Sequence, residues 1–227
     1  MQEFLANTFP NVARTHIELV KGIGQTLEMT IISGAISAVF GIIFGVMLTV
    51  CKPSGIKPMP FIYHVLDKLI NIFRSIPFVI LISLLMPLTR LITGTAIGTT
   101  GAIFPLIIGT VPFFSRQVNA ALEEVNPGMV EAAQSMGCST FQIIWRVLLR
   151  EGRAGIVRGS TITIVNLIGL TAMAGTVGGG GLGDYALRYG FQRRMYDCTV
   201  VTVVILLLLV TVIQSIGNTV TSRLNNK

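Results

Sequence analysis

Four stretches of this sequence run for 23 to 25 residues without a charged side chain: Met29–Cys51, Leu91–Ser115, Gly159–Gly183 and Cys198–Ser222. An α-helix rises about 1.5 Å per residue, so each stretch can cross the roughly 30 Å hydrocarbon core of a bilayer. Only 12% of the residues are charged, whereas a soluble domain has about twice that fraction. We therefore expect an all-α integral membrane protein, with the lipid bilayer as part of its solvent.

A fifth span is predicted from a shorter uncharged stretch, Ser75–Thr89, which contains Pro77. Before it, apolar residues recur at helical spacing, namely Ile62, Leu66, Leu69 and Phe73. We expect one span bent at Pro77. The predicted spans are residues 26–50, 61–89, 100–122, 157–177 and 198–221, within a single transmembrane domain of residues 1–227. Because no signal core precedes the first span, we expect that span to be retained.

The distribution of basic residues predicts the orientation in the membrane. Five spans place the two termini on opposite sides. If the N-terminus is outside, eleven of the seventeen Lys and Arg residues fall in cytoplasmic segments, as the positive-inside bias favours. Arg193 and Arg194 would lie outside and oppose this bias mildly. The net charge of +7 is thus a topology signal, and no nucleic-acid partner is expected.

Several patterns that suggest other kinds of site fail on inspection. The three cysteines lie far apart without a CxxC pair, so neither a disulfide framework nor a metal site is predicted. The cluster Gly178–Gly183 lacks the ending of a phosphate-binding loop and is interpreted as a tight external loop. Glu123 and Glu124 would point about 100° apart on a helix, so they cannot converge on one substrate atom. No catalytic residue and no cofactor is predicted.

A loop of about forty residues, Arg116–Arg158, separates the third and fourth uncharged stretches. Within it, Asn126 and Pro127 read as the start of a short helix that Gly137 ends, and Ser139 and Gln142 read as the capping box of a second helix. The apolar residues of each helix recur at helical spacing, namely Met129, Ala132, Ala133 and Met136 in the first and Phe141, Ile144, Trp145 and Leu148 in the second. Two amphipathic helices in such a loop need the membrane surface or a partner protein to cover them.

Part of this loop resembles the EAA loop of binding-protein-dependent ABC permeases. The matching pattern is Glu131-Ala132-Ala133, then Gly137, then Val147-Leu148-Leu149. In that family the loop forms coupling helices that dock in a groove on a separate ATPase subunit, which implies that the coupling residues here are Glu131, Ala132, Ala133, Gly137, Phe141 and Leu148. Val147 replaces the usual isoleucine, and Arg150 replaces the usual proline, so the second helix is expected to run on toward the fourth span.

Other segments are similar to one branch of that family, the methionine uptake permeases. They are Gly24–Leu27, Asn71–Phe78 and Thr176–Gly183, and the likeness covers nearly the whole chain. It implies a multi-pass protein of the bacterial inner membrane that carries an amino acid, either methionine (D- and/or L-) or another small solute. It also implies partners, namely two ATPase subunits and an extracytoplasmic substrate-binding protein. Because five spans enclose a pathway poorly, we expect a homodimer.

The fourth span carries the candidate translocation path. Asn166, Thr171 and Met173 are its main polar or flexible residues, and Asn166, Leu170 and Met173 form a stripe at helical spacing. A dimer seam explains the stripe equally well. Similarly, the GxxxG pattern of Gly41 and Gly45 fits either close helix packing or a lipid-facing surface.

Two other classes of protein remain as alternatives. A secondary transporter needs coupling-ion sites at mid-membrane, usually carboxylates, and the uncharged spans have none. An intramembrane enzyme needs a catalytic dyad or a metal cluster within a span, and none is visible in the sequence. Both alternatives are therefore weaker than a transport subunit that depends on a partner for ATP hydrolysis.

Overall fold

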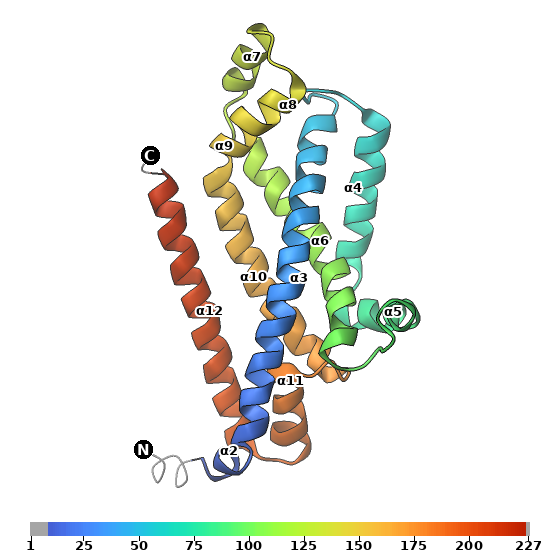
Figure 1. The fold of residues 1–227 in the computed structure, drawn as a ribbon, viewed down its shortest axis with the longest axis vertical. Helices are drawn as coiled ribbons and strands as arrows, with labels where there is room; N and C mark the ends of the chain where they lie inside the picture. The colour runs from blue at the N-terminus through green and yellow to red at the C-terminus, as the bar shows by residue number, and fades with distance from the viewer. Residues whose placement is uncertain (1–8, 226–227) are drawn as a thin grey trace. The chain divides into compact units, whose positions relative to one another are not determined.

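The computed structural model describes residues 9–225, which form helices joined by short turns (Figure 1). In chain order the helices are α2 (Pro10–Arg14), α3 (His16–Cys51), α4 (Pro60–Ser75), α5 (Phe78–Thr93), α6 (Gly98–Glu123), α7 (Pro127–Ser135), α8 (Thr140–Ile143), the π-helical turn η1 (Ile144–Leu148), α9 (Leu149–Glu151), α10 (Arg153–Thr176), α11 (Gly181–Tyr185), the π-helical turn η2 (Ala186–Gln192) and α12 (Tyr196–Asn225). Within residues 9–225 there is no strand.

Four helices, α3, α6, α10 and α12, are long and apolar enough to cross a membrane. The α4–α5 pair makes a fifth span if the sharp bend between the two helices is allowed. These lengths and compositions confirm the predicted all-α membrane fold. Lys227, one of the basic residues behind the predicted orientation, lies outside the described residues.

The predicted second span is broken into two helices. α4 ends at Ser75 and α5 begins at Phe78, with Ile76 in extended conformation (ψ 122°) and Pro77 as the residue before α5. Proline clashes with a helical residue before it and has no backbone N–H to donate, so the chain leaves the helix here. The predicted position of the bend is therefore right, but the bend is a complete interruption.

The described residues divide into two compact units. The first contains the chain up to Ala35 together with Pro77–Ile108 and Ile164–Ile213. The second contains Ile36–Ile76, Gly109–Thr163 and the chain from Gln214 onward. Each of the four long helices contributes one end to each unit. The single domain expected for residues 1–227 stays a prediction.

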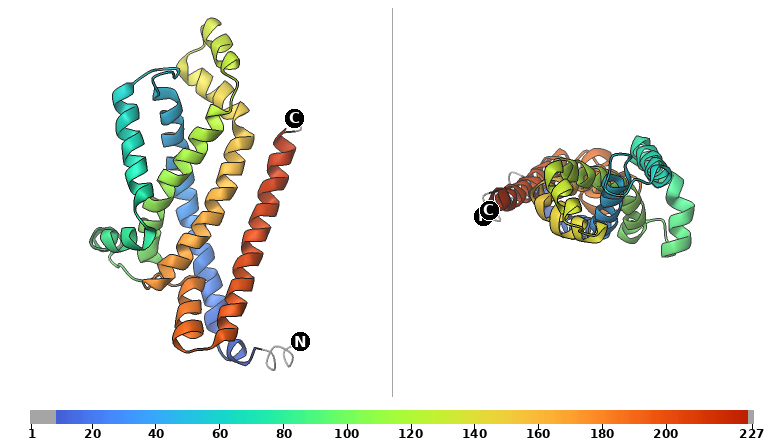
Figure 2. Two further views of the ribbon diagram at one scale, coloured as in Figure 1. Left: turned by 180° about the vertical axis from the view of Figure 1, so that it is seen from behind. Right: turned by 90° about the horizontal axis from the view of Figure 1, so that it is seen from above.

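In the first unit, α2, α11 and the beginning of α12 lie beside the beginning of α3 (Figure 2). Their buried core consists of Leu19, Leu182, Tyr185 and Cys198. Asp197 ties α12 to α2, because its carboxylate accepts hydrogen bonds from the backbone N–H of Asn11 (2.9 Å), the side-chain amide of Asn11 (3.0 Å) and the backbone N–H of Val12 (3.3 Å). The carboxylate thereby satisfies free N–H groups at the start of α2.

In the second unit, α3 packs directly on α6 through its GxxxG pair. Gly41 lies under the ring of Phe114, and a Cβ added to Gly45 would lie 2.6 Å from the Val118 Cβ. Val50, Leu122 and Leu148 continue this buried cluster. The pattern therefore serves close helix packing, and the lipid-facing alternative is wrong.

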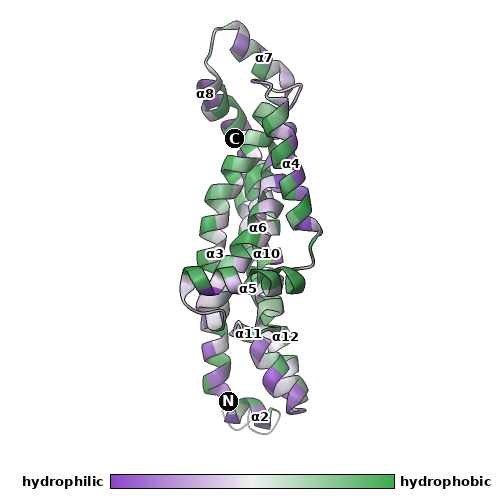
Figure 3. Cartoon of the chain, turned by 90° about the vertical axis from the view of Figure 1, so that its right-hand side faces the viewer, coloured by the Kyte–Doolittle hydropathy of each residue, from purple (hydrophilic) through white to green (hydrophobic). Residues whose placement is uncertain are grey.

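α4 belongs to the second unit and is amphipathic, as its sequence predicts. Figure 3 shows hydrophilic and hydrophobic segments alternating along it. On its polar side, Asp67 pairs with Arg116 of α6, and the Asn71 side-chain oxygen accepts a hydrogen bond of 3.0 Å from the same guanidinium group. One arginine of α6 thus holds two successive turns of α4.

The packing of α3 on α6 yields a first prediction. Gly45→Ala places a methyl group 2.6 Å from Val118 Cβ and 2.8 Å from the Ser115 carbonyl oxygen, so the two helices must separate. Overpacking of this kind costs about 1–3 kcal/mol. We expect Gly45→Ala to lower the thermal unfolding temperature of the detergent-purified protein.

Gly24→Ala, on the same helix, is the matched control, because no atom lies within 4 Å of the added Cβ. Its midpoint should stay unchanged or rise, since alanine favours a helix. Equal midpoints for the two variants would contradict the assigned α3–α6 contact.

Candidate functional site

The α7 helix begins as its sequence predicts. The Asn126 side-chain oxygen accepts a hydrogen bond of 2.9 Å from the backbone N–H of Gly128, and Pro127 occupies the first helical position. Proline has no N–H, so it leaves one fewer donor unsatisfied at this helix start. The start of the predicted coupling helix is therefore fixed by two adjacent residues.

A tight corner at Gly137 separates α7 from α8. Gly137 has φ +75°, a left-handed conformation that glycine adopts without strain. The backbone N–H of Cys138 donates to the Ala133 carbonyl (3.1 Å) and closes the end of α7. Ser139 then caps α8, since its hydroxyl accepts from the backbone N–H of Gln142 while the Gln142 side chain accepts from the backbone N–H of Ser139 (2.8 Å). Both predicted signals, the corner glycine and the capping box, are confirmed.

The segment after the corner leads almost without interruption into α10. α8 passes into η1 and then into α9. Gly152 separates α9 from α10, and its carbonyl accepts a hydrogen bond of 2.9 Å from the backbone N–H of Ile156 in α10. Arg150 stands where the family usually has proline and lies within α9, where an arginine, unlike a proline, allows the helix to continue. The chain from α8 to α10 is therefore nearly continuous helix.

The corner buries one side and exposes the other. Ala133, Ile143 and Leu148 are each at most 3% exposed, whereas the large apolar side chains left exposed are Met129, Met136, Phe141 and Trp145. The predicted apolar stripe of the second helix is split, because the wider π-helical turn rotates Trp145 away from Leu148. Met136, at 75% exposed, and Phe141, at 73%, are the groups that a partner could cover most readily.

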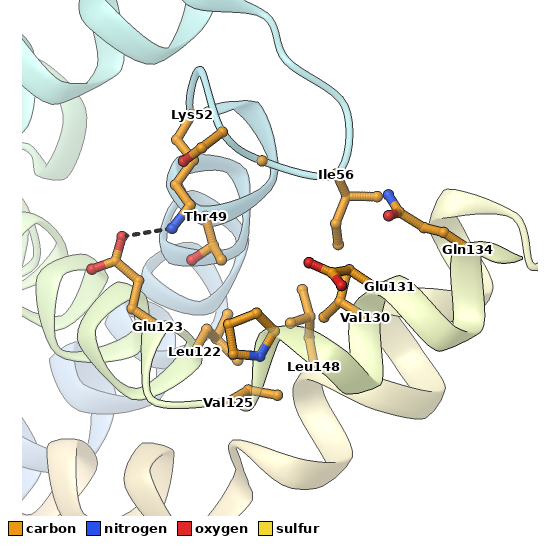
Figure 4. A pocket seen from close by; sticks show the side chains of 13 residues that line it. Thr49, Lys52, Ile56, Leu122, Glu123, Val125, Val130, Glu131, Gln134 and Leu148 are labelled. Carbon is orange, nitrogen blue, oxygen red and sulfur yellow. Dashed lines mark hydrogen bonds and ion pairs between the residues drawn. The ribbon is translucent and has the colours of Figure 1, made fainter.

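A cavity of about 220 Å³ lies between α7 and the ends of α3 and α6 (Figure 4). Val130, Glu131 and Gln134 line it from α7, and Lys52 and Ile56 line it from the α3 end. Glu131 is exposed, and its carboxylate faces this space. The next residue, Ala132, is also exposed. An accessible space therefore separates this side of α7 from the α3 end.

Polar side chains near the end of α6 connect it to its neighbours in the second unit. Glu123 pairs at 3.3 Å with Lys52, the residue after α3, and Glu124 pairs with Arg158 of α10 at 3.2 Å. One turn earlier, the Asn119 amide donates to the buried Thr49 hydroxyl at 3.0 Å. The two glutamates diverge, as expected for adjacent helical residues, and their role is to hold separate helices to α6.

The path residues predicted on α10 fall in the first unit. Met173 is 47% exposed, and Asn166 and Leu170 are half-buried, so the stripe lies on the less covered side of the helix. Thr171 is 1% exposed and its hydroxyl donates to the Ile168 carbonyl at 2.7 Å. Thr171 thus packs inside this unit, away from the stripe.

The glycine loop makes contacts that sequence reasoning missed. The Gln25 side-chain oxygen accepts from the backbone N–H of Gly181 (2.9 Å), and the Thr26 hydroxyl accepts from that of Leu182 (2.9 Å). The loop is therefore bound to α3 in the first unit, although 156 residues separate the partners. The only sequence signal was that both segments resemble the same family.

Tyr185 follows this loop and anchors it. Burial is the main reason that the pKa of Tyr185 is raised to about 12. Its hydroxyl lies 2.7 Å from the Thr15 hydroxyl. The Tyr185 side chain is therefore neutral at physiological pH. Its hydrogen bond connects α11 to Thr15, the residue just before α3.

Comparison with known proteins places these features in a family. Residues 39–226 match the model of the binding-protein-dependent transport system inner membrane component. A probable D-methionine transport system permease protein from Vibrio cholerae is 50% identical over 205 residues, covering 89% of this chain and 90% of the relative. The methionine import system permease protein of Bacillus subtilis is 41% identical over 219 residues, covering 96% of this chain and 98% of the relative.

The fold has a solved counterpart as well. A chain of the MetNI methionine ABC transporter in an inward-facing conformation superposes with a TM-score of 0.91 at 40% identity, covering 93% of this chain and 98% of that chain. The EAA-like corner, the long apolar helices and these matches agree with one another. This chain belongs to the family of binding-protein-dependent transport system inner membrane components.

Proposed function

We propose that this chain is the permease subunit of a bacterial ABC importer and forms the membrane pathway for methionine, as the D- and/or L-isomer. The observation that carries the proposal is the Gly137 corner, where exposed apolar side chains sit on a segment that continues into the α10 span. Such a corner converts a push from a partner into movement of a membrane helix. ATP hydrolysis is the task of a separate subunit.

The substrate is proposed from the names of the similar proteins. The relatives from Vibrio cholerae and Bacillus subtilis are both described as methionine permeases, at 50% and 41% identity. Another small amino acid or a related solute is the alternative. A secondary transporter does not need an EAA-like corner. The presence of this corner therefore gives no support to the secondary-transporter alternative.

The partners follow from the exposed surfaces. Two copies of the chain would surround a path on their two-fold axis, and two ATPase subunits would cover Met129, Met136 and Phe141 of the two corners. Ala133 and Leu148 are buried, so they would act by holding the corner rigid, whereas Glu131, Ala132 and Phe141 can reach a partner. A substrate-binding protein would deliver the amino acid from outside.

The mechanism that we propose uses the corner as a lever. ATP binding would draw the two ATPase subunits together and pull both α7–α8 corners inward. The cavity beside Glu131 gives α7 room for this motion, and the stiff connection through η1 passes it to α10. The spans would then change from inward-open to outward-open. The corner is cytoplasmic in this arrangement, with the N-terminus outside and the C-terminus inside.

Uptake by the reconstituted complex tests the function and the lever together. Proteoliposomes that contain the permease, its ATPase and its binding protein should accumulate labelled methionine only with ATP. Gly137→Leu should abolish most of this uptake, because leucine at φ +75° is strained by about 1 kcal/mol or more.

Gly137→Asn is the matched control, since asparagine tolerates the left-handed conformation better than other residues. It should keep most of the uptake and of the binding-protein-stimulated ATP hydrolysis. Normal coupling in the leucine variant would sink the lever assignment, and uptake without ATP would sink the importer proposal.

Cysteine labelling tests the orientation. Met136, 75% exposed, is a better position than Ser139, whose hydroxyl caps α8. In a variant without native cysteines, expressed without the ATPase so that the corner is uncovered, Met136→Cys should resist an impermeant thiol reagent added to intact cells and react after permeabilisation. Phe191→Cys, on the predicted outer side and also 75% exposed, should react at once. The opposite labelling pattern would reverse the topology.

Substitution of Met173 separates a path residue from a dimer-seam residue. If its thioether plugs the outer end of the path, Met173→Ala should raise ATP hydrolysis in the absence of binding protein and leave dimer yield unchanged. If it lies in the seam, dimer recovery in detergent should fall with uptake. When neither quantity changes, Met173 faces lipid and the path assignment on α10 is wrong.

A further inference from the structure

Three arginines on the segment that leads into α10 have no acidic partner. Arg146, Arg150 and Arg153 are exposed, and within the described residues none of them lies within ion-pair distance of a carboxylate. Arg158, only five residues further on, is paired with Glu124 at 3.2 Å. The run of unpaired arginines in this segment therefore ends before Arg158.

These three side chains share one side of the segment. They are four and three residues apart, which is about one helical turn each. Leu148 and Gly152 are buried, so the opposite side faces the interior of the second unit. Glu151, the nearest carboxylate in the sequence, is about 100° around the helix from Arg150 and does not neutralise it. The result is a basic stripe, defined here as Arg146, Arg150 and Arg153.

The stripe lies where a membrane span begins. Arg153 is the first residue of α10, one of the helices that are long and apolar enough to cross the bilayer. Trp145, 66% exposed, precedes the first arginine. Exposed tryptophan and arginine at the end of a span are the residues that favour the headgroup region, where the ring is half in lipid and the guanidinium groups meet phosphates.

We propose that the basic stripe binds the phosphate headgroup of an anionic phospholipid. Guanidinium groups donate paired N–H groups that match phosphate oxygens, and an anionic headgroup supplies the missing countercharge for the stripe. This inference goes beyond the transport function and does not depend on the identity of the solute. Its functional meaning is that the lipid fixes the height of the coupling segment relative to the membrane.

The single tryptophan of the chain provides a local probe, because Trp145 is adjacent to the stripe. The full-length permease would be placed in nanodiscs of phosphatidylcholine that contain a small share of brominated phosphatidylglycerol or, in a parallel sample, brominated phosphatidylcholine. Bromine quenches tryptophan at contact distance. We expect several-fold stronger quenching by the anionic lipid at equal content, and we expect this preference to fall as salt is raised.

Replacing all three arginines of the stripe by glutamine should make the two brominated lipids quench equally. Arg158→Gln is the matched control and should keep the preference, because Arg158 already has a carboxylate partner. Arg150→Gln alone should lower the preference partly, which keeps the test valid if the triple variant does not fold.

Equal quenching in the wild type, no quenching by either lipid, or an unchanged preference in the triple variant would each overturn the proposal. A loss of ATPase association in the triple variant without any lipid preference in the wild type would assign the stripe to the ATPase partner instead. Methionine uptake is measured separately, so failure of the lipid site leaves the transport proposal intact.

Discussion

Lipid offers no hydrogen bonds to a peptide backbone, and this constraint dictates the structure at every level. Each span must satisfy its own N–H and C=O groups, so helices such as α3, from His16 to Cys51, run without a break. Interruptions are then confined to residues that cannot continue a helix or that allow an unusual backbone. Pro77 ends one helix and begins another, and Gly137 and Gly178 take positive φ at the ends of α7 and α10.

The same constraint explains why a few polar side chains are needed to hold the helices of the second unit together. Where the surroundings are as apolar as the side chains, burial alone distinguishes poorly between helix pairings. α6 therefore uses specific contacts: Arg116 with α4, Asn119 and Glu123 with α3, and Glu124 with α10. Close packing of Gly41 and Gly45 completes the pairing of α3 with α6. α6 is thereby the fixed support from which the α7–α8 corner projects.

The corner combines rigidity with accessible apolar surface. Caps at Asn126 and Ser139 fix the starts of its two helices. In the second helix, the π-helical turn η1 is wider than an α-helical turn and changes the directions in which the following side chains point. This change of direction keeps Leu148 in the core and turns Trp145 outward. The exposed apolar side chains of α8 and the basic stripe therefore share one segment, which continues into α10.

Sequence by itself determined the membrane class, both helix caps of the corner and the family resemblance, because uncharged length and capping are local properties. It also located the bend at Pro77. Only the tertiary structure decided that Gly41 and Gly45 face α6, that Gln25 and Thr26 bind the glycine loop, and that Thr171 points away from the stripe of Asn166 and Met173. Helical spacing fixes which residues share a side, whereas which neighbour covers that side depends on residues far apart in the chain.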